Sequence, residues 1–317
     1  MSQASPRLSM YHISPQKFSD GVVFAPEPKI KFWRGASLVS CQLGVPRGGR
    51  GKSHTWSRGV IHKFSKGARR RVLRLVATLR RSVTPVFCTL TYPDLFEPDP
   101  RIWKKHLDIL FKRFGRKFPG ATIIWRLEAK RRQTGESTGM IAPHFHLLAY
   151  NVGYFSLLNW LPLAWYEVVG SGDPQHLAWH RGECGNGNKP CVQPVRSVRG
   201  VLHYTSKYIC KAENLDLPGW GRYWGIVNRH DLPGIQGEFE MVELGEQAAL
   251  DVLRYMRRFA SICRDKHGRY IGRRKVPGWG AKYTLICDAD FWFKALPKIS
   301  ACYADTPAEL SIPGGRS

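Results

Sequence analysis

The chain has 317 residues, of which 43% are hydrophobic and 23% are charged, a composition that excludes intrinsic disorder and suffices for one large or two modest cores. Its formal net charge of +25 argues for a polyanionic partner, nucleic acid first and an anionic membrane surface second. No stretch approaches the ~18–20 apolar residues of a membrane span, and the first residues lack the apolar core of a signal peptide. We therefore expect no membrane anchor and a location in the cytoplasm.

The first 60 residues are rich in Pro, Gly and Ser and include the run VPRGGRGKSH. This composition predicts a basic, poorly structured N-terminal arm. Residues 63–81 then predict an amphipathic helix, because Val72, Leu75 and Val76 recur at helical spacing. Four arginines border this apolar stripe: Arg69, Arg70, Arg71 and Arg74. They form either a solvated face or a contact with the phosphate backbone of DNA.

An apolar, β-branched segment follows at residues 86–94, flanked by Pro85 and Pro93, and predicts a buried strand. Residues 99–118 predict a helix, and residues 155–169 predict a second, Trp-rich helix. Strands followed by helices in this order favour an α+β fold.

Two further strands are expected at residues 121–130 and 142–150, joined by one polar loop. Alternation along each strand places Glu128 on the non-core face of the first, and His144 and His146 on the non-core face of the second. An antiparallel pairing would bring the three side chains together. One carboxylate and two imidazoles suit an open divalent-cation site. The alternative is a pair of half-exposed histidines on an ordinary strand.

Residues 170–194 are expected to form a loop insert. It contains two histidines and two cysteines, at His176, His180, Cys184 and Cys191. These side chains could hold zinc, but their spacing matches no common zinc template. Free thiols in a reducing compartment are the favoured interpretation. Residues 219–225 predict a turn that packs aromatic side chains, with Arg222 as a possible phosphate contact.

The segment 196–213 predicts a helix that contains YTSKYICK. Two overlapping Tyr-x-x-Lys units, Tyr204 with Lys207 and Tyr208 with Lys211, would then share one stripe roughly 100° wide. An ammonium group beside a phenol lowers the phenol pKa and can bind a phosphate. Taken alone, the segment also fits a surface helix with two ordinary tyrosines.

Three pieces therefore stand in order: the Thr-rich strand CTLTY, the strand HFHLLA and the YxxKYxxK helix. Together they resemble the HUH endonuclease superfamily, and the doubled tyrosine unit resembles the two-tyrosine rolling-circle initiators of small single-stranded DNA phages. The resemblance covers roughly residues 60–230 and implies a ferredoxin-like HUH palm with a central antiparallel sheet. It implies Mg²⁺ or Mn²⁺ on His144 and His146, with Glu128 as third ligand, and Tyr204 and Tyr208 as nucleophiles beside Lys207 and Lys211.

The implied activity is nicking and rejoining of single-stranded DNA at a replication origin through a 5′-phosphotyrosine intermediate. A host helicase and DNA polymerase, in the cytoplasm of a bacterial host cell, are the implied partners. The alternatives are a non-catalytic nucleic-acid-binding protein, a transposase or relaxase of the same superfamily, and a metal hydrolase of another class.

Three regions are expected along the chain. They are an arm at 1–60, an endonuclease domain at 61–230 and a C-terminal α/β extension at 231–317. Within the extension, residues 239–244 predict a strand and residues 247–264 predict a helix, followed by an irregular tail.

Overall fold

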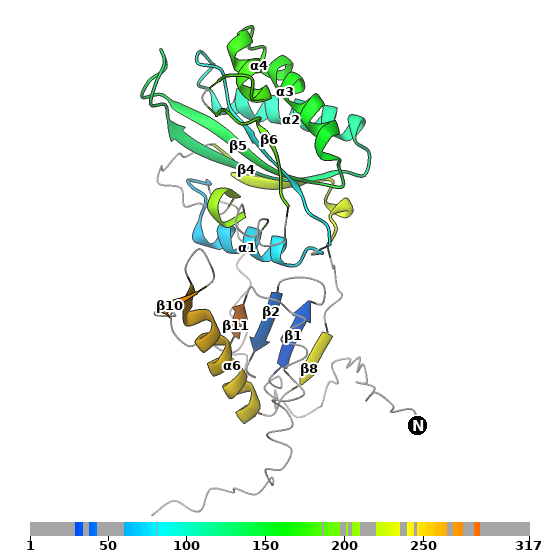
Figure 1. The fold of residues 1–317 in the computed structure, drawn as a ribbon, viewed down its shortest axis with the longest axis vertical. Coiled ribbons are helices and arrows are strands. Elements are labelled where there is room, and N and C mark those ends of the chain that lie inside the picture. The colour runs from blue at the N-terminus through cyan, green and yellow to red at the C-terminus, as the bar shows by residue number, and fades with distance from the viewer. Residues whose placement is uncertain are drawn as a thin grey trace, which may run out of the picture.

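The computed structural model describes residues 29–33, 38–42, 60–80, 82–185, 187–196, 201, 205–209, 220–234, 240–243, 246–264, 269–274 and 282–285. Within them the chain forms a five-stranded sheet, a four-stranded sheet and a two-stranded hairpin (Figure 1). All strand pairs of the five-stranded sheet are antiparallel, and helices cover it. The expected α+β, palm-like fold is confirmed.

The five-stranded sheet has the order β6-β3-β5-β4-β7. Its strands are β3 (Val86–Leu90), β4 (Thr122–Arg131), β5 (Ile141–Tyr150), β6 (Val192–Pro194) and β7 (Trp224–Val227). β4 and β5 form the longest pair, in register from Thr122 opposite Tyr150 to Arg131 opposite Ile141. The three central strands agree with the segments that the sequence predicted as strands.

Helices cover the two faces of this sheet unequally. On one face, the α2 face, lie α2 (Pro100–Lys117), α3 (Tyr154–Val169) and α4 (Pro174–Arg181) (Figure 1). On the opposite face, the α1 face, lie α1 (Lys66–Ala77) and the short helix η1 (Thr205–Ile209). The amphipathic helix expected at 63–81 is confirmed over α1, where Val72 and Val76 are buried.

Local sequence fixes where the helices begin. The carboxylate of Asp99 accepts a hydrogen bond from the backbone N–H of Arg101, and Pro100 occupies the first turn of α2. Ser65 caps α1 by accepting from the backbone N–H of Ala68. Such caps satisfy N–H groups that the first turn of a helix leaves unpaired.

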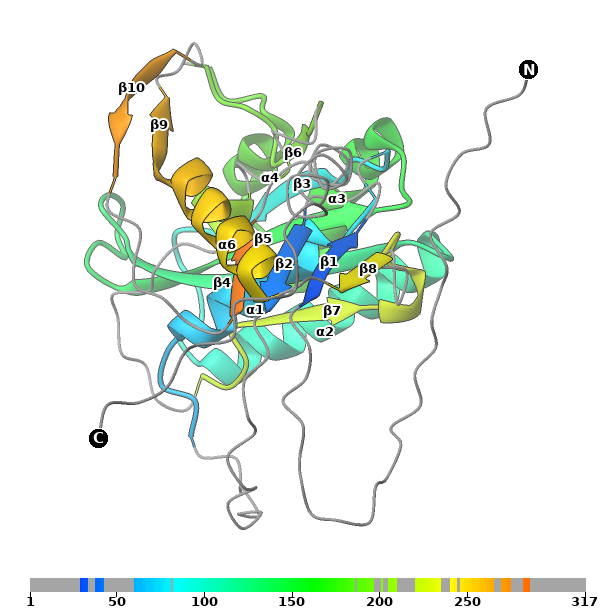
Figure 2. The same ribbon diagram turned by 90° about the horizontal axis from the view of Figure 1, so that it is seen from below.

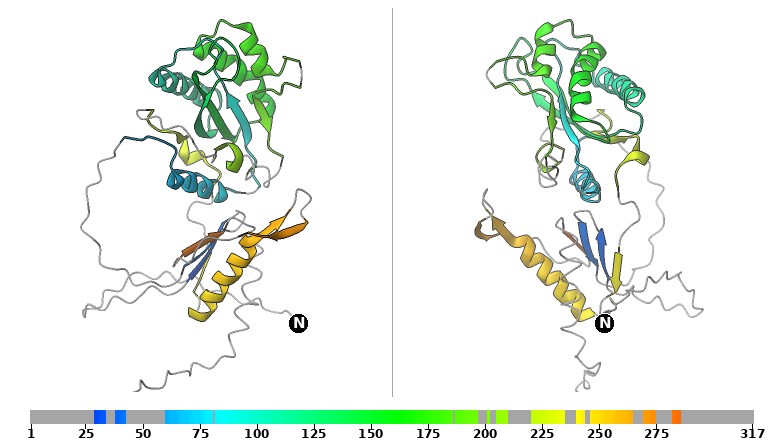
Figure 3. Two further views of the ribbon diagram at one scale, coloured as in Figure 1. Left: turned by 90° about the vertical axis from the view of Figure 1, so that its left-hand side faces the viewer. Right: turned by 45° about the vertical axis from the view of Figure 1, so that its right-hand side comes forward.

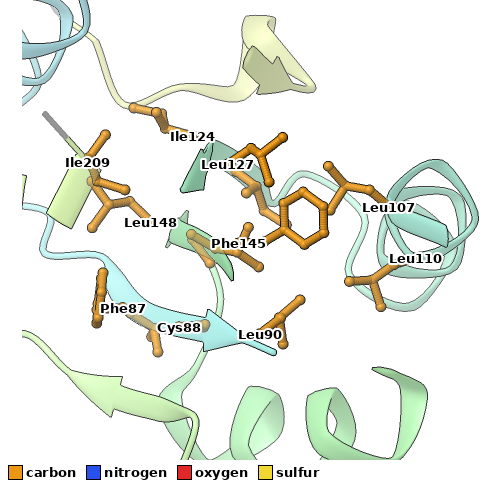
Figure 4. Packing of buried hydrophobic residues seen from close by; sticks show 14 of the residues in the cluster. Phe87, Cys88, Leu90, Leu107, Leu110, Ile124, Leu127, Phe145, Leu148 and Ile209 are labelled. Atoms are coloured by element: carbon orange, nitrogen blue, oxygen red, sulfur yellow. The ribbon is translucent and has the colours of Figure 1, made fainter. Parts of the chain in front are cut away.

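The hydrophobic core lies on both faces of the central strands. Leu107 and Leu110 of α2 point at Phe145 and its neighbours on the α2 face (Figure 4). On the α1 face, Ile209 of η1 is fully buried and packs near Leu148. Apolar packing on both faces explains why the central strands contain so few exposed residues.

The four-stranded sheet joins segments from both ends of the chain, in the order β11-β2-β1-β8. Its strands are β1 (Lys29–Trp33), β2 (Leu38–Gln42), β8 (Glu240–Glu243) and β11 (Lys282–Leu285). Helix α6 (Glu246–Ser261) lies along one side of this sheet (Figures 2 and 3), where Cys41 Sγ is 3.9 Å from the carbonyl oxygen of Ala249. The strand and helix expected at 239–244 and 247–264 are confirmed.

Three expectations need correction. Little structure was expected in residues 1–60, yet β1 and β2 lie there, and each is paired on both sides. The rest of that segment lies outside the described residues, apart from residue 60. The insert 170–194 holds α4 and β6, and the turn expected at 219–225 runs into β7.

The two-stranded hairpin pairs β9 (Ile262–Arg264) with β10 (Tyr270–Arg273). It falls partly in the tail that was expected to be irregular. A short 3-10 turn, η2 (Arg229–Asp231), follows β7. Among the described residues, no helix is long and apolar enough to span a bilayer.

Candidate active site

Two neighbouring strands bring one carboxylate and two imidazoles onto the α1 face. β4 and β5 pair with Glu128 opposite His144 and with Arg126 opposite His146. Side chains directly opposite each other on an antiparallel pair stand about 4.5–5.5 Å apart at Cβ. The antiparallel pairing and the shared face that the sequence predicted for Glu128, His144 and His146 are therefore present.

A buried hydrogen bond joins Glu128 to His146. The Oε2 atom of Glu128 is 2.8 Å from Nε2 of His146, and the two residues are only 4% and 3% exposed. The second ring nitrogen of His146, Nδ1, lies 3.2 Å from Oγ1 of Thr89 on β3. Because both ring nitrogens have partners, the orientation of the imidazole is fixed. Burying an ionisable pair is costly, so this pair is better explained by a task than by stability.

Both histidines of the site are held neutral by burial. Burial lowers the pKa of His146, against the opposing effect of the hydrogen-bonded Glu128 carboxylate. Burial, with the nearby charge of Lys130, lowers the pKa of the half-buried His144 to about 3. The Lys130 ammonium lies 3.5 Å from Oε2 of Glu128. A neutral imidazole is the form that binds a metal ion.

The donor chemistry fits a divalent cation, but the side chains are not gathered around one. A carboxylate and two neutral imidazoles are ligands that Mn²⁺ and related cations accept. Across the described part of the chain, no group of three or more His, Cys, Asp or Glu residues is arranged to hold a metal. The hydrogen bond between Glu128 and His146 accounts for this in part, since a cation between them would have to replace it.

A tyrosine lies against the same histidine. The ring centroid of Tyr208 is 5.5 Å from that of His146 and 5.1 Å from that of Phe87 on β3. Tyr208 is half-buried, while its neighbours Thr205 and Ile209 in η1 are fully buried and anchor the short helix. The phenol is thus held beside the Glu128–His146 pair, on the α1 face of the sheet.

The helix that carries Tyr208 differs from the α-helix that the sequence predicted. The described residues, Thr205–Ile209, form a π-helix. Single π turns are rare and occur frequently at functional sites. Tyr204 and Lys211 lie outside the described residues, as does the side chain of Lys207. The predicted stripe of two tyrosines and two lysines therefore stays a prediction.

Basic side chains border this face. Of the four arginines singled out in α1, Arg70, Arg71 and Arg74 are exposed and Arg69 is half-buried. α1 packs against η1, so the arginines belong to the element next to Tyr208. Arg222 is also exposed, and its carbonyl oxygen accepts a hydrogen bond from Lys104.

Two side chains of the site were missed from the sequence. Thr89 holds the His146 ring, although the sequence analysis noted only that its strand is rich in Thr. Arg126 is fully buried, and its guanidinium carbon lies 4.1 Å from the ring centroid of Phe64. Its position on the polar side of β4, two residues before Glu128, was the available signal. Its charge contributes to lowering the pKa of His146.

One comparison with known proteins gives a result. No curated protein and no solved structure matches the chain. A family model, described as replication-associated protein ORF2, matches residues 85–213. This segment runs from β3 to η1 and contains Glu128, His144, His146 and Tyr208. The match supports a place for the chain among rolling-circle replication initiators.

Proposed function

We propose that this protein nicks single-stranded DNA at a replication origin and thereby starts rolling-circle replication, with Tyr208 as nucleophile. The observation that carries the proposal is the placement of Tyr208 against His146, which is itself hydrogen-bonded to Glu128. All three residues lie inside the segment that matches the replication-associated family model.

The reaction is a transesterification. The phenol oxygen of Tyr208, having lost its proton, attacks the phosphorus of the scissile phosphodiester. An O–P bond forms to the tyrosine, and the P–O3′ bond breaks. The leaving 3′ oxygen takes up a proton and becomes a free 3′-OH, which a host polymerase can extend. The number of phosphoester bonds is unchanged, so rejoining the strand needs no nucleotide hydrolysis.

Glu128, His144 and His146 would hold the cation, Mg²⁺ or Mn²⁺, and Thr89 would support them. The chemistry a bound cation supplies is neutralisation of charge on a non-bridging phosphate oxygen. Thr89 accepts the Nδ1 proton of His146 and so leaves the Nε2 lone pair free as a ligand. The Phe87 ring, stacked at 5.9 Å from the ring of His146, limits rotation of the imidazole.

The remaining residues of the YxxKYxxK unit extend the proposal to termination. Tyr204 would act as the second nucleophile and cut the regenerated origin while Tyr208 holds the first end. Lys207 and Lys211 would bind the phosphate and favour the phenolate form of each tyrosine. Two tyrosines four residues apart on the protein would then alternate between rounds, as in the phage initiators that the unit resembles.

Single-stranded DNA would lie on the α1 face, where the arginines of α1 border η1. Arg69, Arg70, Arg71 and Arg74, with Arg222, would contact phosphates, which gives binding a steep salt dependence. The domain expectation persists as part of the proposal, with residues 61–230 as the nicking domain. A host helicase in the cytoplasm of a bacterial cell would unwind the duplex ahead of the polymerase.

The test is formation of a covalent adduct. Purified protein is incubated with Mn²⁺ and a library of single-stranded DNA, and DNA that stays attached to protein after denaturation is sequenced. Wild type is expected to carry one sequence at its 5′ end, and Tyr208→Phe is expected to lose most of the adduct. Tyr270→Phe, at an exposed tyrosine of β10, is the matched control and should behave as wild type. Adduct formation by the Tyr204→Phe/Tyr208→Phe double variant would refute the assignment, and binding without any adduct would favour a non-catalytic DNA-binding protein.

A further inference from the structure

Helix α4 places two buried histidines at the end of strand β3, away from Tyr208 and its neighbours. His176 and His180 are 5% and 1% exposed and stand four residues apart, so they share one side of the helix. Their ring centroids are 4.7 Å apart and the rings are nearly perpendicular, at 83°. Both rings point at Thr91, the first residue after β3.

Four electron-pair donors converge there. The Nε2 atoms of His176 and His180 are 3.1 Å apart. They lie 3.0 and 3.3 Å, respectively, from the carbonyl oxygen of Thr91. The hydroxyl oxygen of Thr91 is also 3.3 Å from Nε2 of His180. Each of these atoms offers a lone pair to a common point.

Hydrogen bonds alone do not satisfy this arrangement. Burial lowers the pKa of both histidines, that of His180 to about 3, so each ring is neutral and carries one N–H. Two Nε2 atoms at 3.1 Å can share one proton at most. The Thr91 carbonyl already accepts a 2.7 Å hydrogen bond from the indole of Trp165. Within the described residues both Nδ1 atoms are buried without a hydrogen-bond partner, so no distribution of protons satisfies all four ring nitrogens.

We propose that His176 and His180 form a binding site for a divalent transition-metal cation of the zinc type, with an oxygen of Thr91 as the third donor. At metal–nitrogen distances of about 2.0–2.1 Å, donor atoms of a tetrahedral site stand about 3.3 Å apart. The separations of 3.0–3.3 Å here are close to that value. Two imidazoles favour zinc, copper, nickel or iron, whereas Mg²⁺ and Ca²⁺ prefer oxygen ligands. The preference separates this site from the one proposed around Glu128.

The site is small and leaves at least one position open. Among the described residues, no third His, Cys, Asp or Glu side chain completes it. Cys184 and Cys191, in the same insert, are free thiols. Water would occupy the remaining position. A cation bound here connects α4 to the end of β3, two residues after Thr89, and stabilises the folded chain because an unfolded chain lacks the preformed site.

The experiment uses full-length, untagged protein carrying His144→Ala and His146→Ala, which removes the imidazoles of the other proposed site. The metal-free protein is titrated with Co²⁺ and with Zn²⁺. We expect one equivalent of Co²⁺ to give the visible absorption of a nitrogen-ligated ion, and Zn²⁺ to displace it. Zn²⁺ should also raise the thermal midpoint by about 3 °C or more.

Adding His176→Gln and His180→Gln to this background should abolish the absorption and the thermal shift. His230→Gln, at a histidine whose side chain is 80% exposed, is the matched control and should leave both unchanged. Circular dichroism before the titration shows whether each variant is folded, and His180→Gln alone provides a milder change. The proposal is wrong if the His144→Ala/His146→Ala protein binds no Co²⁺, or if folded His180→Gln binds it as tightly as its parent.

Discussion

The two faces of the five-stranded sheet are built from the same strands but have opposite chemistry. On the α2 face, β4 and β5 present Leu127, Phe145 and Leu147, all buried against apolar side chains of α2 and α3. On the α1 face the alternate residues include Arg126, Glu128 and His146, which are as deeply buried. One face has the composition of an ordinary core, and the other buries charge.

The contrast separates what stabilises the fold from what the fold is for. Apolar burial contributes roughly 25 cal/mol per Å², whereas a buried ion pair often contributes less than apolar residues of the same size. The α2 face can therefore supply stability at no functional cost. Residues on the α1 face are expected to trade stability for activity. Changes on the two faces should separate these effects.

The largest effect on stability is expected from Phe145→Ala on the α2 face. Phe145 is fully buried and its ring packs edge-on against Trp165 at 6.0 Å. Removing it leaves a cavity and should lower the free energy of unfolding by about 3–5 kcal/mol, measured by urea denaturation. Phe155→Ala, at a residue that is 74% exposed, should change it by less than about 0.5 kcal/mol. Equal effects of the two changes would contradict the assignment of the core to this face.

The next effect concerns Glu128→Gln on the α1 face. An amide of the same shape can still hydrogen-bond Nε2 of His146, so we expect the free energy of unfolding to change by less than about 1 kcal/mol. Loss of the carboxylate should lower the rate of DNA cleavage by about 100-fold or more. Glu136→Gln, at an exposed residue of the β4–β5 loop, is the control. Wild-type cleavage by Glu128→Gln would remove this carboxylate from the site.

A smaller loss of activity is expected from Thr89→Val, which keeps the shape and removes the hydroxyl bonded to Nδ1 of His146. Loss of such a supporting contact typically costs 10–100-fold, and we expect about 10-fold in cleavage with DNA affinity unchanged. Thr89→Ser restores the hydroxyl and should recover most of the rate. Failure of Ser to rescue would mean that Thr89 acts through packing alone.

The central strands and their faces could be predicted from the sequence because side chains alternate with a period of two. Glu128 and His144 stand opposite each other as expected, since a short loop and the apolar alternation leave one antiparallel register. The partner of β1 could not be predicted in this way. β1 pairs with β8, about 200 residues later in the chain, and nothing in either segment specifies the other.

Glycine misled the prediction at β7. Residues 219–225 contain three glycines and were interpreted as a turn. In the structure Gly225 lies opposite Trp125, and a Cβ at that position would stand 2.7 Å from the indole nitrogen. The glycine serves a close approach within a sheet and not a turn, which only the fold reveals. The π form of η1 is likewise a product of packing, since Thr205 and Ile209 are both fully buried there.

The smallest expected effect distinguishes the two faces as DNA-binding surfaces. Arg71 of α1 and Arg116 of α2 are both exposed and lie on opposite faces. Because each phosphate contact contributes a slope of about −0.7 for single strands in a plot of log affinity against log salt, Arg71→Ala should reduce the magnitude of that slope by about 0.7. Arg116→Ala should leave it unchanged. If both variants lose the same amount, DNA contacts both faces of the protein, and the division into a structural and a functional face fails for binding while standing for catalysis.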